Sequence, residues 1–206
     1  MTGYALAERL ALASTMELFG PDAPTLCAGW SVRDLAAHIV LRERRPDAAA
    51  GIVVRRVAPH TARVQARIAA GNFPDLLRRM RTRPWWIRPV DELINVTEMF
   101  VHHEDVRRAQ GGWAPRDLDH GLRRTLFQQL RRIPLRRLRR LPAVVHLEAP
   151  GFGAARAGGS GPDTVRITGD PGELLLFFVG RQSHAIVNLD GPAPLTEHLR
   201  RARLGI

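Results

Sequence analysis

The chain has 206 residues, a formal net charge of +11 and 45% hydrophobic residues. This length suits one domain or a domain with a small appendage, and the composition is that of a globular chain rather than a disordered one. The longest purely apolar run, Leu174 to Val179, is far shorter than the ~20 residues that a membrane-spanning helix needs. An integral membrane protein built of helices is therefore excluded.

Cys27 is the single cysteine of the sequence. It cannot form an internal disulfide or a zinc site made only of cysteines, and such sparse cysteine usage is typical of a reducing compartment. Glu8 and Arg9 interrupt the one apolar stretch near the start, where a secretory signal would be unbroken. We therefore expect a cytoplasmic protein without a secretory signal.

Helical periodicity dominates the chain up to residue 141. The clearest helix start is Ser31, a predicted N-cap with Asp34 as the acid of a capping box and Trp30 placed to pack on Leu35. Segment 83–89 contains two prolines, so we expect a loop there that buries Trp85 and Trp86. Helices are predicted over residues 4–19, 31–45, 47–57, 60–70, 73–80, 90–110 and 115–140, the last with a kink at Pro134.

The pattern changes after Pro142, where short β-type runs replace helical periodicity. Glycine and proline crowd residues 150–162, which we interpret as a turn-rich connection. Strands are predicted over residues 144–148, 165–168 and 185–189, and helices over 171–179, capped by Asp170, and 195–203. The fold class is thus mainly α: a helical bundle over residues 1–141, followed by a small α+β subdomain over residues 142–206.

One segment of the predicted helix 90–110 carries a pattern suited to metal chemistry. Glu98 and His102 are four residues apart, so their side chains lie one turn apart on one helix face, and Asp105 shares that face. His103 is turned away by about 100°. A carboxylate and an imidazole at this spacing can supply two metal ligands, whereas a catalytic zinc site takes three protein ligands and keeps one open position.

His38 is the candidate third ligand. It lies on a face of the predicted helix 31–45 whose middle is apolar, and a histidine that points inward there requires a polar partner. Asp34, one turn earlier, and Asp105 are candidates to accept the other imidazole N–H of a ligand histidine. The spacing also permits simpler interpretations, in which Glu98 and His102 form a solvated helix pair and His38 is a hydrogen-bonded core residue.

The order of these residues resembles a known superfamily. Cys27-Ala-Gly-Trp30-Ser-Val-Arg-Asp34-Leu-Ala-Ala-His38 resembles the opening motif of the DinB-like and mycothiol-dependent maleylpyruvate isomerase superfamily, and Glu98-x-x-x-His102-x-x-Asp105 is similar to its second motif. The C-terminal piece resembles the extra subdomain of the isomerase, and the segments around Cys27 and after His38 resemble an uncharacterised metal-binding subgroup.

The resemblance implies a four-helix bundle with up-down-down-up topology that holds zinc or a similar divalent ion. By its implication, His38, Glu98 and His102 are the ligands. It further implies thiol chemistry, in which a metal-bound thiolate of mycothiol adds to a small electrophilic substrate in an isomerase or S-transferase reaction. Arg181 is a candidate for binding the anionic substrate or cofactor, although a cation at a helix C-terminus is also favoured by the helix dipole.

Other classes of protein stay open. All 31 basic residues are arginine, and the absence of lysine indicates a compositional bias as well as a functional charge. Eight arginines fall within residues 123–140, which favours nucleic acid as an alternative partner, although the interleaved aromatic residues typical of such surfaces are missing. A metal-binding protein without catalysis is a third class. Cys27 is interpreted as a small buried residue rather than a nucleophile, and the sequence leaves the oligomeric state open.

Overall fold

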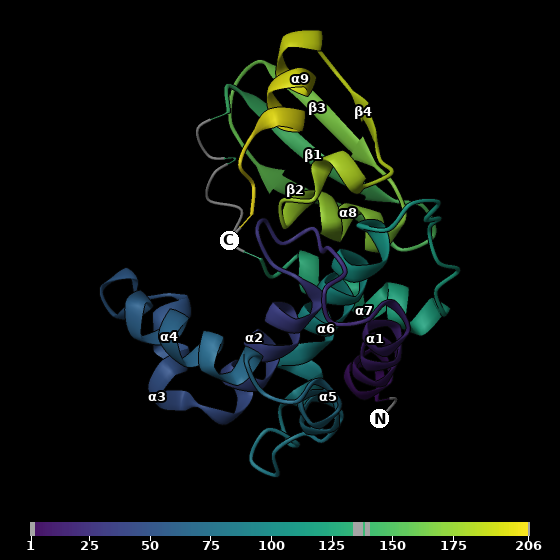
Figure 1. Ribbon diagram of the computed structural model, residues 1–206. Coiled ribbons are helices and arrows are strands. Elements are labelled where there is room, and N and C mark those ends of the chain that lie inside the picture. Colours follow the sequence, from purple (N-terminus) through teal and green to yellow (C-terminus); the bar gives the residue numbers. More distant parts are fainter. Residues whose placement is uncertain (1–2, 134–137, 139–140, 206) are drawn as a thin grey trace. The chain divides into compact units, whose positions relative to one another are not determined.

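The computed structural model describes residues 3–133, 138 and 141–205, which are mainly helical with a four-stranded sheet (Figure 1). The chain divides into two compact units, Met1–Pro115 and Arg116–Ile206. Among the described residues, no helix is both long and apolar enough to cross a membrane.

The first unit is helical, and its elements follow the predicted periodicity closely. α1 packs along α6, and the core beneath them is formed by apolar side chains such as Leu12, Leu35 and Met99. Segment 47–57 is broken into α3 and two 3-10 turns rather than one helix. The elements of this unit are α1 (Tyr4–Phe19), α2 (Val32–Arg44), α3 (Pro46–Ala49), η1 (Ala50–Ile52), η2 (Arg55–Val57), α4 (Ala58–Ala69), α5 (Phe73–Arg81) and α6 (Asp91–Arg108).

The second unit combines a sheet with helices, as predicted for the C-terminal part. The strand order is β2-β1-β3-β4, with β1 and β3 parallel and the two outer pairs antiparallel. α8 is buried along its whole length and packs against α7. The elements of this unit are α7 (His120–Leu130), β1 (Ala143–Ala149), β2 (Gly153–Gly158), β3 (Asp163–Thr168), α8 (Pro171–Phe178), η4 (Gln182–His184), β4 (Asn188–Asp190) and α9 (Ala193–Arg201).

Three predicted elements were wrong in extent. The helix predicted over residues 115–140 is α7, which begins at His120 because the carboxylate of Asp119 accepts hydrogen bonds from the first backbone N–H groups, and ends at Leu130. The kink predicted at Pro134 lies outside the described residues. The glycine-rich connection contains strand β2, which its small residues do not favour by themselves and which forms by pairing with β1. The third predicted strand is limited to β4, since Gln182 to His184 form a 3-10 turn before it.

The loop at residues 83–89 exists, but its aromatic residues are not buried. Trp85 and Trp86 are 74% and 51% exposed, and their rings meet edge to face. Pro84 and Ile87 occupy the buried positions of the turn instead. A tight turn can bury the residues on one of its two sides only. The prediction was wrong because the hydrophobicity of Trp85 and Trp86 did not determine which side of the turn faces the core.

Along the chain, the first compact unit ends at Pro115, whereas the domain boundary predicted from the sequence is at residue 141. α7 belongs with the second unit because Leu122, Leu126 and Leu130 are buried there and α7 packs on α8. A boundary at residue 141 between independently folding parts stays a prediction.

Candidate metal centre

Helices α2 and α6 bring the three predicted ligands together. His38, Glu98 and His102 each offer one donor atom, and these atoms all lie within 4.8 Å of one another. His102 Nε2 lies 3.5 Å from Glu98 Oε2, and the two imidazole rings meet edge to face with centroids 5.7 Å apart. The i,i+4 spacing on α6 therefore converges on the histidine that α2 contributes.

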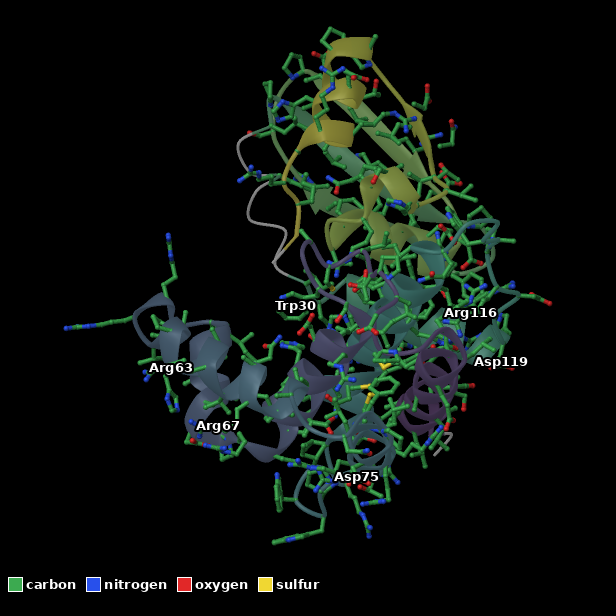
Figure 2. All side chains as sticks on the ribbon, in the orientation of Figure 1. Trp30, Arg63, Arg67, Asp75, Arg116 and Asp119 are labelled. Atoms are coloured by element: carbon green, nitrogen blue, oxygen red, sulfur yellow. The ribbon has the colours of Figure 1, made fainter. Side chains whose placement is uncertain are left out.

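The start of α2 fixes the position of His38. Ser31 and Asp34 form the predicted capping box, because each side chain accepts a hydrogen bond from the other residue's backbone N–H. Trp30 stands in the loop immediately before this cap (Figure 2). Its ring packs on the imidazole of His38, with centroids 5.0 Å apart, and the side chain also packs against the apolar cluster that contains Leu35. The indole therefore limits the rotation of the His38 ring.

The second nitrogen of His102 faces an acid. His102 Nδ1 lies 2.9 Å from Oδ2 of the fully buried Asp105. A carboxylate in this place can orient the imidazole of a metal ligand. The thiol of Cys27 donates to the same oxygen of Asp105 over 3.2 Å. These contacts occupy the Nδ1 side of the ring, so its Nε2 faces Glu98.

Asp34, His103 and Arg181 do not contact the three candidate ligands through the hydrogen bonds described for their side chains. The carboxylate of Asp34 accepts hydrogen bonds from Ser31, and its backbone oxygen accepts one from Gln65 Nε2 over 3.3 Å. His103 faces α1, where Glu8 and Thr15 contact its two ring nitrogens, as expected for a residue turned away from the site. Arg181 lies in the second unit and donates to the backbone oxygen of Val179.

The electrostatics of the site differ at each ligand. Burial lowers the pKa of His38 to about 4, and the neighbouring His102 adds to that effect. Burial would raise the pKa of Glu98, but its hydrogen bond to His102 and the charge of Arg42 outweigh burial and lower the pKa to about 2. Burial would lower the pKa of His102, but hydrogen bonds to Asp105, Cys27 and Glu98 hold that pKa well above its usual range. Glu98 is thus an anion and His38 a neutral imidazole at pH 7.

This donor set fits a divalent ion such as zinc. A tetrahedral zinc ion with ligand bonds of about 2.0–2.1 Å holds its donor atoms roughly 3.4 Å apart, close to the 3.5 Å between His102 and Glu98. Two imidazoles and one carboxylate are a known catalytic zinc set. Among the described residues, Cys27, His102 and Asp105 form a second group with metal-ligand spacing, but it shares His102 with the first.

Four side chains that surround the ligands were not predicted as part of the site. Trp30 contacts His38, and Gln65 donates to the backbone oxygen of Asp34, one turn before His38. Cys27 contacts Asp105, and Arg42 lies 3.9 Å from Glu98. Arg42 could have been found, because it is four residues after His38 and so lies on the same face of α2. Gln65 comes from α4 and has no such signal in the sequence.

Fold and site together define a mainly helical protein with a small sheet and a His-Glu-His centre suited to a divalent ion. Two solved structures share this fold: the mycothiol-dependent maleylpyruvate isomerase and a histidine-to-alanine mutant of that isomerase. Each aligns over 93% of this chain and 92% of the isomerase chain, with a TM-score of 0.61 and 16% sequence identity. The fold of this chain is therefore shared with the mycothiol-dependent maleylpyruvate isomerase, as the resemblance implied.

The sequence comparisons give no further relative. No protein-family model matches the chain, and no curated protein matches it significantly.

Proposed function

We propose that this chain is a divalent-metal protein, with zinc as the first candidate, and that it catalyses a thiol-dependent isomerase or S-transferase reaction on a small electrophile. The observation that carries the proposal is the convergence of His38, Glu98 and His102 within 4.8 Å. The fold shared with a mycothiol-dependent isomerase supports the choice of chemistry and makes mycothiol the first thiol to test.

The proposal includes an architecture and a location. We infer that the helices of the first unit form the up-down-down-up four-helix bundle of the DinB-like fold. A single cysteine fits a reducing compartment, so a cytoplasmic location belongs to the same proposal.

Each residue of the site and its surroundings would have a separate role. His38, Glu98 and His102 would hold the ion, and Asp105 would keep the Nδ1 proton of His102 in place. When bound, the metal lowers the pKa of a coordinated thiol and so supplies a nucleophile at neutral pH. Trp30 packs on His38, while the side chain of Glu98 is 37% exposed and that of His102 only 11%, so Glu98 is the more accessible of these two ligands. Arg181 stays a candidate for binding an anionic group of the cofactor or substrate.

The alternatives differ in what they require. A metal protein without catalysis would bind zinc with the same ligands and show no thiol-dependent turnover. Nucleic-acid binding through residues 123–140 stays a prediction. In the described part of that segment, Arg123 pairs with Asp117 and Asp170, and this pairing is typical of a solvated surface.

Metal content is the first test. Elemental analysis of the untagged protein after zinc loading should give about one ion per chain, and His38→Ala and His102→Ala should each lose it. His60→Ala is the matched control, because His60 lies half-exposed beside Asp47 on the same unit. Zinc that persists in both ligand variants would refute the site. Turnover of a maleyl-type electrophile that requires both zinc and mycothiol would then separate the enzyme from the non-catalytic alternative.

A further inference from the structure

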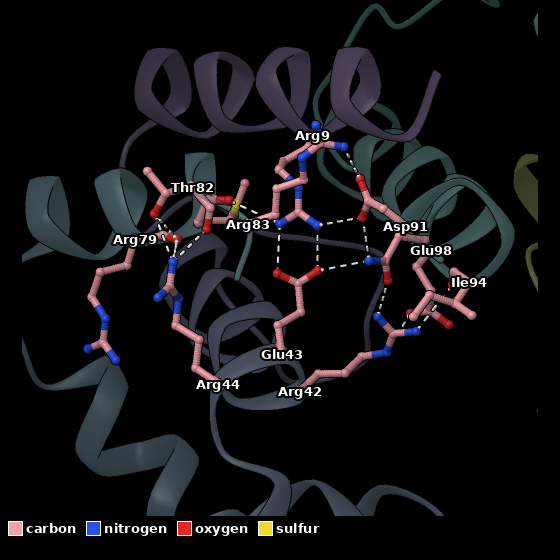
Figure 3. Close-up of polar contacts among 12 residues, drawn as sticks. Arg9, Arg42, Glu43, Arg44, Arg79, Thr82, Arg83, Asp91, Ile94 and Glu98 are labelled. Atoms are coloured by element: carbon pink, nitrogen blue, oxygen red, sulfur yellow. Dashed lines mark hydrogen bonds and ion pairs between the residues drawn. The ribbon is translucent and has the colours of Figure 1, made fainter. Parts of the chain in front are cut away.

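A buried polar cluster joins α1, α2 and α6 next to the candidate metal centre (Figure 3). Arg9 is fully buried, and its guanidinium pairs with the carboxylates of Glu43 and Asp91 and donates to the backbone oxygen of Met80. Arg83 donates to the other oxygen of Asp91 over 2.8 Å. Two carboxylates and a backbone oxygen thus hold the two Nη atoms of Arg9, although its buried Nε has no hydrogen-bond partner among the described residues. Buried charges are tolerated when they are paired in this way, so the cluster has a fixed arrangement.

Asn95 connects this cluster to Arg42. Its amide nitrogen donates to Glu43 and Asp91 over 3.1 and 2.7 Å, and its amide oxygen accepts from Arg42 Nη1. Arg42 Nη2 donates to the backbone oxygen of Ile94 over 3.3 Å. Because Asn95 is fully buried and its amide orientation is set by two carboxylates, the guanidinium of Arg42 is held in one place.

The guanidinium so held faces a candidate metal ligand. Arg42 Nε lies 3.9 Å from Glu98 Oε2 (Figure 3). The same oxygen lies 3.5 Å from His102 Nε2. The side chains of Arg42 and Glu98 are 24% and 37% exposed, so the pair is open to small ligands. A metal ion at this site would therefore compete with Arg42 for one oxygen of Glu98.

We propose that Arg42 is a positioning residue that pairs with Glu98 until a metal ion takes that carboxylate, and that metal binding then leaves Arg42 as a binding group for the carboxylate of an anionic ligand. The inference rests on the proposed metal site. Asn95 and Ile94 keep the guanidinium in place during the exchange, so its charge stays beside the ion. A planar fork of N–H donors that has lost its carboxylate partner is suited to a second carboxylate.

Two consequences follow from the exchange of partners. Arg42 opposes metal binding, because the ion must replace an existing ion pair and approach a fixed positive charge. The metal favours anion binding at Arg42, because it removes the competing carboxylate. By linkage, an anion that binds Arg42 also raises the affinity for the metal.

The first experiment measures zinc affinity by competition with a chelator of known affinity. Arg42→Gln should bind zinc about three- to tenfold more tightly than the wild type, and Arg42→Lys should stay near the wild type because it keeps the charge. Arg44→Gln is the matched control. It removes the same charge from the same helix, but Arg44 donates to the backbone oxygens of Arg79 and Thr82 instead. Unchanged or weaker zinc binding in Arg42→Gln would overturn the inference, whereas a wild type that binds no zinc would overturn the proposed function itself.

The second experiment titrates succinate, as a carboxylate probe, into the zinc-loaded and zinc-free proteins by calorimetry. The zinc-loaded wild type should bind it at least about fivefold more tightly than zinc-loaded Arg42→Gln, in line with a charge-assisted, two-point contact. The zinc-free wild type should bind succinate no more tightly than zinc-loaded Arg42→Gln does. Equal affinity in zinc-loaded wild type and Arg42→Gln would show that the probe binds the ion only, and equal affinity with and without zinc would show that Glu98 does not block Arg42. Either result overturns the inference.

Discussion

At the scale of single residues, the two histidines of the candidate metal centre have opposite environments. His38 is desolvated and packed under Trp30, which lowers its pKa to about 4, whereas hydrogen bonds to Asp105 and Glu98 raise the pKa of His102. Asp105 is fully buried, and its carboxylate holds the Nδ1 side of His102. The orientation of that ring thus depends on a carboxylate that does not belong to the ligand set.

Replacing Asp105 tests this role. Asp105→Asn keeps the size of the side chain but loses the charge that orients and polarises His102, so zinc affinity should fall about 10- to 100-fold. The measurement is chelator competition on the purified variant, with a urea titration to show that it is folded. Cys27→Ser keeps a donor toward Asp105 and should bind zinc like the wild type. If Asp105→Asn bound zinc with the affinity of the wild type, the carboxylate of Asp105 would not be what orients the His102 imidazole.

At the scale of elements, the helices with strong local signals were predicted and the weakly patterned segments were not. α1, α2, α4, α5 and α6 lie within a few residues of their predicted bounds, because a 3.6-residue apolar period and a cap are local properties. β2 was missed, since its Gly-Ala-Ala-Arg-Ala-Gly sequence gains a strand conformation only by pairing with β1.

The cap of α2 gives a prediction at this scale. Ser31→Ala removes the side-chain oxygen that accepts from the backbone N–H of Asp34, and the free energy of unfolding should fall by about 1 kcal/mol. Urea denaturation of the metal-free protein measures this change in the free energy of unfolding. Ser14→Ala, at an exposed position inside α1, is the control and should change the stability by less than about 0.5 kcal/mol. Equal effects of the two substitutions would mean that the cap contributes no more than an ordinary surface position.

At the scale of the whole molecule, the first unit has a charged cluster inside its helical packing. Arg9, Glu43 and Asp91 come from three helices and are each at most 4% exposed. Burial would raise the pKa of Asp91, but hydrogen bonds from Asn95 and Arg83 and the charge of Arg9 outweigh it and lower that pKa. The arrangement of three helices is thus linked to the ionisation of one carboxylate.

The linkage predicts how stability changes with pH. The folded-state pKa of Asp91 lies below the unfolded value of about 3.9. Its contribution to stability is therefore complete above that unfolded pKa and is lost as the pH falls through the lower, folded pKa. Urea unfolding between pH 7 and pH 3 should show a loss below about pH 4 that is smaller in Asp91→Asn. Asp75→Asn, on the exposed end of α5, should keep the wild-type pH profile. An Asp91→Asn protein with that same profile would contradict the linkage.

The sequence by itself determined the local parts of this protein. It placed the main helices, the capping box at Ser31 and the pair of Glu98 and His102 on one face of α6, because helix geometry fixes the relation of residues three or four positions apart. Only the tertiary structure decided that His38 of α2 joins this pair, and that Arg42, held by the buried Asn95, lies beside Glu98. It also decided that Arg9 is buried and Trp85 exposed. These outcomes depend on packing between segments tens of residues apart, and neither residue type nor spacing specifies which side chains then meet.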